Sequence, residues 1–285
     1  MRRAPLTRCV LFALALLTLL AITGAAYQTL ASRVDARRFP HPGRLVSVGG
    51  FRLNVYCIGQ GSPTAVLESG LADSLESWRR VQPGIARFAR VCSYDPAGYG
   101  YSDPGPMPRT SDRIASELHT ALRSAGEKLP YVLVRHSFGG YNIRVFNGKY
   151  PDEVAGLVLV DATQEDQYRL LPRAWIDGGA AMRRRAERQA FWASLYIGLG
   201  LARSHDKPLV VLTAGRTLDA SLKAMLSEQD QNAYENTWVN DLQLRLAHLS
   251  TRGRRIMIPD SGHDMPTDRP DAIVTAVREL CGHPN

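Results

Sequence analysis

Ser137 lies in the segment VLVRHSFGG, Val132–Gly140, where an apolar run ends at a serine that a glycine follows two residues later. This pattern is similar to the G-x-S-x-G turn between a strand and a helix, which exposes a serine hydroxyl above a sheet. A hydroxyl in that position can attack an acyl group, and the Phe138 N–H at the start of the following helix would face the resulting oxyanion. The segment therefore indicates nucleophilic acyl chemistry.

A serine nucleophile needs a general base, and His263 is the best candidate among the seven histidines. It ends the segment PDSGH, directly after the last predicted strand and 126 residues beyond Ser137. A histidine on such a loop can reach a hydroxyl at the same edge of a sheet. His136 is excluded as the base because the side chains of adjacent residues point apart.

Two carboxylates could orient that histidine. Asp161 directly follows the predicted strand Leu157–Val160, whereas Asp219 lies several residues beyond the predicted strand Leu209–Thr213. No carboxylate occurs in Ala214–Arg216, so we favour Asp161 and leave Asp219 as the alternative. A second oxyanion donor is expected after the predicted strand Thr64–Glu68, where the Leu71 N–H is the candidate.

Arg135 departs from the pattern, because a glycine is expected two residues before the nucleophile. Its fixed positive charge would lie close to the Ser137 hydroxyl. It would then lower the basicity of His263 or bind an anionic group of a substrate. The departure also leaves a second class of function open, a hydrolase fold with weakened or absent catalysis that serves as a binding protein.

The elements that must position these residues alternate between strands and helices, which predicts an α/β fold with a mostly parallel sheet covered on both faces. The predicted strands are Arg44–Val48, Phe51–Ile58, Thr64–Glu68, Arg90–Tyr94, Tyr131–Val134, Leu157–Val160, Leu209–Thr213 and Arg255–Ile258. The predicted helices are Trp78–Ala89, Ser111–Gly126, Phe138–Tyr150, Glu228–Leu249 and Pro270–Leu280. Residues 162–207 interrupt this alternation and are predicted to be a helical lid between two parts of one core, residues 33–161 and 208–285.

The N-terminal segment, residues 1–32, contains 18 uncharged residues from Cys9 to Ala26, with arginines on both sides. At 1.5 Å per residue, such a helix spans roughly 27 Å, close to the thickness of a bilayer's hydrocarbon core. We expect a single membrane anchor with the following domain exported, or a cleaved signal peptide and a secreted domain if Gly24–Ala26 is a cleavage site. Ala31–Arg44 is predicted to be a polar tether.

The net charge of +8 does not indicate nucleic-acid binding, because residues 1–38 alone hold six arginines against one aspartate. The remaining 247 residues carry only +3 and no basic stripe with interleaved aromatic residues. The four cysteines form no CxxC or zinc-site spacing. Cys57 and Cys92 could form a disulfide in an exported domain or remain two buried thiols.

Several segments together resemble the α/β-hydrolase superfamily, in particular its lid-bearing, esterase- and lipase-like members with a membrane-anchored N-terminus. These segments, which span residues 44–285, are GSPTAVLESGLADSLESW, RVCSYDPAGYGYSDPGP, PYVLVRHSFGG, YPDEVAGLVLVDA and IPDSGHDMPTDRPDAI. The resemblance implies a Ser–His–acid hydrolase that acts on a small acyl substrate without a cofactor.

The resemblance also refines three expectations. A serine at position 137, where haloalkane dehalogenases and epoxide hydrolases have aspartate, implies an acyl-enzyme intermediate. Hydrolysis of a carboxylic ester is the main expectation, with peptidase, thioesterase and lactonase activities left open. Some lidded members have their acid after the strand before the lid, which suits Asp161. In the superfamily's strand order the strands of Cys57 and Cys92 are neighbours, which favours the disulfide.

Overall fold

Residues 1–42 form a unit of their own that contains one long helix, α1 (Ala4–Arg38). The computed structural model describes residues 4–172, 206–216, 218 and 220–282 of the chain. Within α1, the stretch Arg8–Asp35 is long and apolar enough to cross a membrane, judged by length and composition alone. The prediction of a tether from Ala31 is wrong for its first eight residues. The helix continues to Arg38 because nothing interrupts its hydrogen bonds before Pro40, which disfavours helical geometry at the residue before it.

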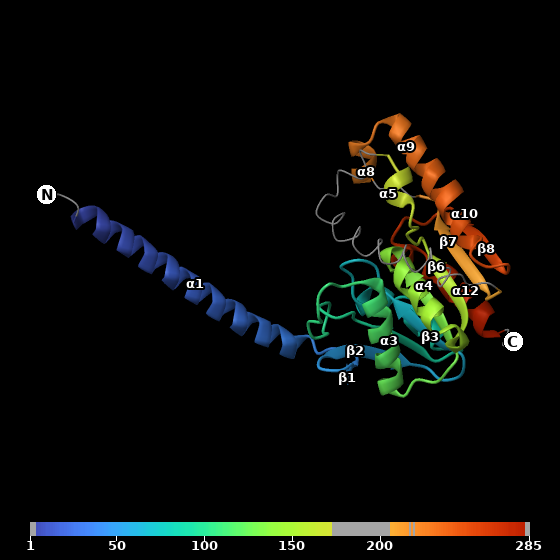
Figure 1. Cartoon of the computed structure of the whole chain (residues 1–285), viewed down its shortest axis with the longest axis horizontal. Coiled ribbons are helices and arrows are strands. Elements are labelled where there is room, and N and C mark those ends of the chain that lie inside the picture. The colour runs from blue at the N-terminus through green and yellow to red at the C-terminus, as the bar shows by residue number, and fades with distance from the viewer. Residues whose placement is uncertain (1–3, 173–205, 217, 219, 283–285) are drawn as a thin grey trace. The chain divides into compact units, whose positions relative to one another are not determined.

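The second unit, residues 43–285, contains an eight-stranded sheet in the order β1-β2-β4-β3-β5-β6-β7-β8 (Figure 1). β1 pairs antiparallel with β2 and β2 with β4, and all further pairs are parallel. This arrangement confirms the predicted fold class. The strands are β1 (Arg44–Ser47), β2 (Arg52–Ile58), β3 (Thr64–Glu68), β4 (Val91–Tyr94), β5 (Tyr131–His136), β6 (Val154–Val160), β7 (Leu209–Ala214) and β8 (Gly253–Ile258).

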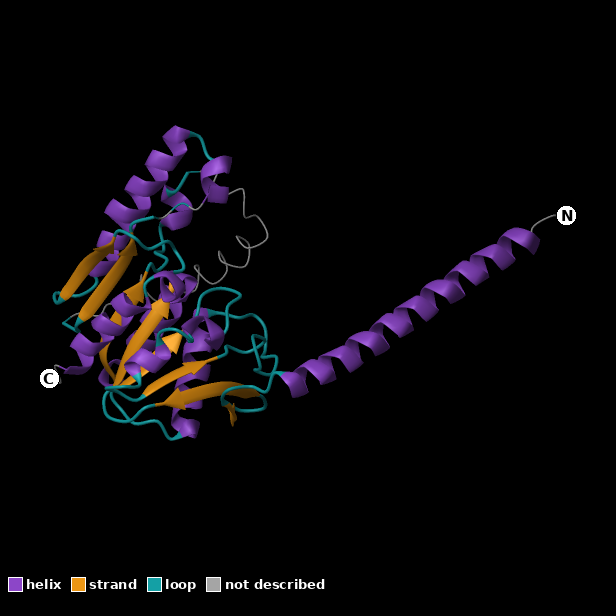
Figure 2. Ribbon diagram, turned by 180° about the vertical axis from the view of Figure 1, so that it is seen from behind, coloured by secondary structure: helices purple, strands orange, loops and turns teal. Residues whose placement is uncertain are grey.

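Helices cover both faces of the sheet (Figure 2), and nearly every residue of β3, β5, β6 and β7 is therefore buried. Along β5, Leu133 belongs to a core cluster with residues of α3 (Ser111–Ala125), α4 (Gly140–Lys149) and α10 (Gln243–Ala247). Val132 and Val134 point to the opposite face and pack with α2 (Gln82–Ile85) and α12 (Pro270–Gly282). Successive residues of β5 therefore face different layers, which later decides where Arg135 and His136 lie.

Two predicted helices are more irregular than their sequence pattern suggested. The predicted helix Trp78–Ala89 is a 3-10 turn, η1 (Leu75–Trp78), followed by the short α2, which has Pro83 in its first turn. The predicted helix Glu228–Leu249 consists of α9 (Glu228–Glu235), a π-helical segment η4 (Asn236–Leu242), and α10. The remaining elements are η2 (Ser137–Gly139), η3 (Pro151–Glu153), α5 (Gln167–Leu170), α8 (Ala220–Met225) and α11 (Met265–Asp268).

The predicted lid lies mainly outside the described residues. Residues 162–172 leave the end of β6 and contain α5, residues 206–207 lead into β7, and positions 173–205 are not among those described. The lid and the three-part division of the chain therefore stay predictions.

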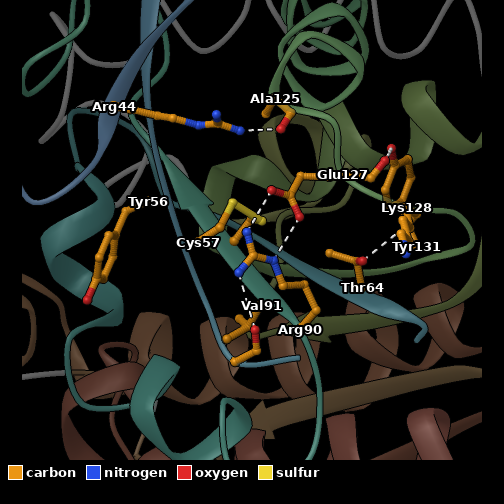
Figure 3. A network of polar contacts seen from close by, with 12 residues as sticks. Arg44, Tyr56, Cys57, Thr64, Arg90, Val91, Ala125, Glu127, Lys128 and Tyr131 are labelled. Atoms are coloured by element: carbon orange, nitrogen blue, oxygen red, sulfur yellow. Dashed lines mark hydrogen bonds and ion pairs between the residues drawn. A yellow bond between two sulfur atoms is a disulfide. The ribbon is translucent and has the colours of Figure 1, made fainter. Parts of the chain in front are cut away.

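Cys57 and Cys92 are directly opposite one another on β2 and β4 and form a disulfide. Beside it, Glu127 accepts hydrogen bonds from Arg90 Nε at 2.9 Å and from Arg90 Nη2 at 2.8 Å (Figure 3). Thr64 and Tyr131, the first residues of β3 and β5, bond to the backbone at Lys128 and Glu127. This polar network joins the amino ends of the parallel strands, the edge opposite to the one where Ser137 lies.

Candidate active site

Ser137 directly follows β5 and is the first residue of η2, the 3-10 turn that leads into α4. Its φ of 52° is in the left-handed region, which a residue with a side chain adopts only when its surroundings enforce it. The loop after β6 provides that constraint, because the Thr163 N–H donates to the Ser137 carbonyl oxygen at 3.1 Å. Strained geometry at a serine between a strand and a helix is the expected form of an exposed nucleophile.

His263 lies on the loop after β8 and contacts the serine directly. Its Nε2 is 2.8 Å from Ser137 Oγ, and its Nδ1 is 2.6 Å from Asp161 Oδ2. The three residues follow the carboxyl ends of β8, β5 and β6, and parallel strands bring such ends to one edge of the sheet. The structure thus brings together the three side chains that the sequence suggested, in the order serine, imidazole, carboxylate.

Asp161 is buried, and both its backbone and its carboxylate form hydrogen bonds. Its backbone has a φ of 40°, and its N–H donates to the Leu212 carbonyl oxygen at 2.7 Å. Its Oδ1 accepts hydrogen bonds from the Ala214 N–H at 3.2 Å and from Trp238 Nε1 at 3.0 Å. The competing candidate, Asp219, lies outside the described residues.

Sequence reasoning missed Trp238. The residue lies in η4, the π-helical part of a helix whose sequence looked regular, and it is 3% exposed. A π-helical turn changes the direction in which a side chain leaves the helix, and such turns are frequent at functional sites. A tryptophan on a helix is normally read as core, so only the contact with Asp161 distinguishes it.

The electrostatics of the site raise the pKa of His263. Burial lowers this pKa, but the hydrogen bond to Asp161 and the negative charge of Asp161 outweigh that effect, with a further contribution from Asp264. The pKa of His263 therefore lies above its ordinary value of 6.5. A base with a raised pKa accepts the serine proton more readily, provided that the solution pH keeps the imidazole neutral beforehand.

His136 has a different part in the same site. Its side chain is buried, and its Nε2 lies 2.7 Å from the His263 carbonyl oxygen, to which it can only donate. Burial and the nearby His263 lower the pKa of His136 to about 3, so the ring stays neutral. His136 thus fixes the backbone of the His263 loop.

The two proposed oxyanion donors come from segments that lie side by side. Gly70 follows β3 and packs against the serine so closely that a Cβ at this position would be 3.4 Å from Ser137 Cβ. Leu71 is the next residue, and Phe138 is in the first turn after β5, where N–H groups have no partner within the helix. The backbone arrangement is therefore compatible with an oxyanion site formed by Leu71 and Phe138.

Arg135 does not lie where the sequence suggested. It is 1% exposed and forms an ion pair with Glu68, so it cannot bind an anionic group of a substrate. The groups that shift the pKa of His263 are Asp161 and Asp264, and Arg135 is not among them. The expectation that Arg135 weakens the base or recruits an anion is therefore wrong, because Glu68, on the neighbouring strand, compensates its charge. A charged residue at the end of the buried strand TAVLE was the sequence signal for this partner.

Within the described part of the chain, one group of potential metal ligands is close enough to share an ion: Cys57, Cys92 and Glu127. The disulfide consumes both thiolates, and Arg90 pairs with the carboxylate, so this group does not fit a metal. It also lies at the opposite edge of the sheet from Ser137.

Comparisons with known proteins agree with this architecture. The family model for the alpha/beta hydrolase fold matches residues 63–241. The chain is 24% identical over 233 residues to the uncharacterized protein YqjL of Bacillus subtilis. This match covers 78% of this chain and 85% of that protein. The chain is 29% identical over 156 residues to the uncharacterized protein YbdG of the same organism, and this match spans 54% of the chain but only 48% of that relative.

A solved structure of a thermophilic esterase from Thermogutta terrifontis is similar in fold, with a TM-score of 0.56 and 18% sequence identity. The similarity covers 83% of this chain and 96% of that one. At this level of identity the likeness concerns the fold alone.

Proposed function

Because this chain belongs to the alpha/beta hydrolase fold family, we propose that it is a serine hydrolase that cleaves carboxylic esters or related acyl bonds through an acyl-enzyme. One observation carries the proposal. Ser137 Oγ, His263 and Asp161 form a continuous chain of hydrogen bonds, with the serine on a strained turn. This is the arrangement in which a hydroxyl becomes a nucleophile through an adjacent base and a carboxylate that orients the base.

The proposed reaction follows from these contacts. Ser137 Oγ attacks the carbonyl carbon of the substrate while His263 Nε2 accepts the hydroxyl proton. Asp161 stabilises the resulting imidazolium. The N–H groups of Leu71 and Phe138 stabilise the negative oxygen of the tetrahedral intermediate. Its collapse releases the alcohol, protonated by His263, and leaves an acyl-serine. A water molecule, activated by His263, then hydrolyses this ester and regenerates the hydroxyl.

The alternative, a hydrolase-fold binding protein with weakened or absent catalysis, rests on Arg135 in place of the expected glycine. The buried ion pair of Arg135 with Glu68 and the contact between Ser137 and His263 favour the active hydrolase over this alternative. The proposal for the domain organisation is residues 33–161 and 208–285 as the hydrolase core, with residues 162–207 as its lid.

A fluorophosphonate probe tests the proposal, because it forms a covalent bond to an activated serine and releases fluoride. We expect stoichiometric labelling of the wild type, with the adduct on the peptide containing Ser137, and at least a hundredfold slower labelling of His263→Ala. Mass spectrometry of the digested protein locates the adduct. His248→Ala is the matched control, because His248 is exposed at the end of α10. An unlabelled wild type, or equal labelling rates in all three proteins, would favour the binding-protein alternative.

We further propose that α1 anchors the domain on the outer, oxidising side of a membrane. The support is the apolar stretch Arg8–Asp35 together with the Cys57–Cys92 disulfide, since disulfides persist mainly in oxidising compartments. In a bacterial host, the full chain is expected in the membrane fraction after carbonate washing. Protease added to spheroplasts should digest its hydrolase domain. Recovery in the soluble fraction with an N-terminus after residue 26 would indicate a cleaved signal peptide, and protection from the protease would contradict export.

A further inference from the structure

Arg135 and Glu68 form a buried ion pair next to the turn that carries Ser137. The two residues are register partners on the neighbouring parallel strands β5 and β3. The Arg135 side chain is 2% exposed and the Glu68 side chain 1%, and Arg135 Nη1 pairs with Glu68 Oε1. Successive side chains of β5 point to opposite faces of the sheet. Arg135 is therefore on the same face as Leu133, the face that α4 covers, and His136 is on the other.

The glycine at position 139 provides the space for this side chain. A Cβ at this position would overlap the guanidinium group of Arg135. A glycine usually occupies the position two residues before the nucleophile. Here position 135 is an arginine, and its side chain occupies the volume that a Cβ of residue 139 would take. The guanidinium group of Arg135 therefore packs against the backbone of the turn that carries Ser137.

The same guanidinium group also contacts the loop after β3. Arg135 Nη2 donates to the Ser69 carbonyl oxygen at 3.0 Å. Ser69 precedes Gly70 and Leu71, the residues that pass beside the nucleophile. On the other side of the ion pair, Asn142 Nδ2 of α4 donates to Glu68 Oε1 at 2.7 Å. One buried network therefore joins the ends of β3 and β5 and the first turn of α4.

We propose that Arg135 is a positioning residue that sets the geometry of the oxyanion site. This inference rests on the proposed serine hydrolase activity. The two oxyanion donors belong to different segments, the Leu71 N–H to the loop after β3 and the Phe138 N–H to the turn after β5. Arg135 donates a hydrogen bond to the first segment, at Ser69, and packs against Gly139 of the second segment. Since an oxyanion site acts only when its donors are held at the position of the developing charge, loss of this bridge weakens binding of the transition state more than binding of the substrate.

The main test combines Arg135→Lys with the double variant Arg135→Met/Glu68→Gln, which leaves no unpaired buried charge. We expect kcat for a p-nitrophenyl ester to fall at least tenfold in the double variant, with KM changed less than twofold. Affinity for a trifluoromethyl ketone, which mimics the tetrahedral intermediate, should fall in the same proportion as kcat. Arg135→Lys keeps the charge opposite Glu68 but not the planar guanidinium group, so its kcat should lie between those of the double variant and the wild type.

Arg109→Met/Glu117→Gln is the matched control, because it removes another buried arginine–glutamate pair, whose ion pair joins Arg109 to Glu117 of α3. All rates are divided by the concentration of active sites, which is determined by titration with a fluorophosphonate. A loss of folded protein then does not appear as a fall in kcat. The control should then match the wild type. Unchanged kcat in both Arg135 variants, or an equal fall in Arg109→Met/Glu117→Gln, would contradict the inference. Failure of the proposed function is a separate result, namely a Ser137→Ala variant that still hydrolyses the ester.

Discussion

Replacing Ser137 with alanine is expected to lower kcat for p-nitrophenyl acetate by on the order of 10⁴- to 10⁶-fold, to the level of a protein without a nucleophile. His263→Ala is expected to cause a loss of similar size, because Ser137 Oγ then has no acceptor for its proton. The two side chains act as one unit in a single proton transfer. The double variant should therefore lose no more activity than the more damaging single variant.

Steady-state kinetics on purified proteins measure these effects, with the circular dichroism spectra of the variants as a check on folding. Comparison of p-nitrophenyl esters of increasing chain length then indicates the preferred acyl group. The control is again His248→Ala, which is expected to retain the wild-type rate. Multiplicative losses in the double variant would mean that serine and histidine act independently, contrary to the hydrogen bond between them.

Asp161→Asn is expected to lower kcat by about 10⁴-fold, as the equivalent change does in serine proteases. The reason lies in the hydrogen bonds around this carboxylate. Asp161 Oδ1 already accepts from the Ala214 N–H and from Trp238 Nε1, so the asparagine carbonyl oxygen would occupy that position. The amide NH₂ would then face His263 Nδ1 and donate to it. This hydrogen bond favours the tautomer of His263 that carries its proton on Nε2, so only a small fraction of the molecules could accept the proton of Ser137.

The same substitution changes the pH dependence of catalysis in a defined direction. His263 must be neutral to act as a base, so kcat/KM falls as the pH decreases through the His263 pKa. In the wild type, Asp161 raises this pKa above 6.5, and the acidic limb of the profile should be centred above that pH. In Asp161→Asn the raising contributions of Asp161 disappear while the effect of burial remains, so the limb should move to lower pH.

Profiles of kcat/KM between pH 4 and 9 measure this shift, with the residual activity of Asp161→Asn followed at high protein concentration. Asp219→Asn is the matched control, because Asp219 was the competing candidate for the acid, and it is expected to keep both the rate and the profile of the wild type. Inactivation of Asp219→Asn with an active Asp161→Asn would assign the role to Asp219 instead.

Much of the fold could be predicted because it depends on local patterns. Buried strands such as Thr64–Glu68 are short apolar runs bounded by turn residues, and the helix α3 begins at the cap residue Thr110 and ends at Gly126 with a φ of 74°. Two of the predictions that failed concern backbone geometry inside a regular pattern. The π-helical segment in η4 and the 3-10 turn before α2 depend on what these helices pack against, which the spacing of apolar residues does not encode.

Ser137, His263 and Asp161 could be chosen from the sequence, because each lies within five residues of the end of a predicted strand. The carboxyl ends of parallel strands meet at one edge of a sheet. The side chains that support these three residues could be identified only from the folded chain. Trp238 reaches Asp161 from a helix 77 residues away, and Glu68 neutralises Arg135 from the neighbouring strand. Such contacts depend on strand order and on the face to which each side chain points. The charge of Arg135 therefore had no defined effect until its partner was known.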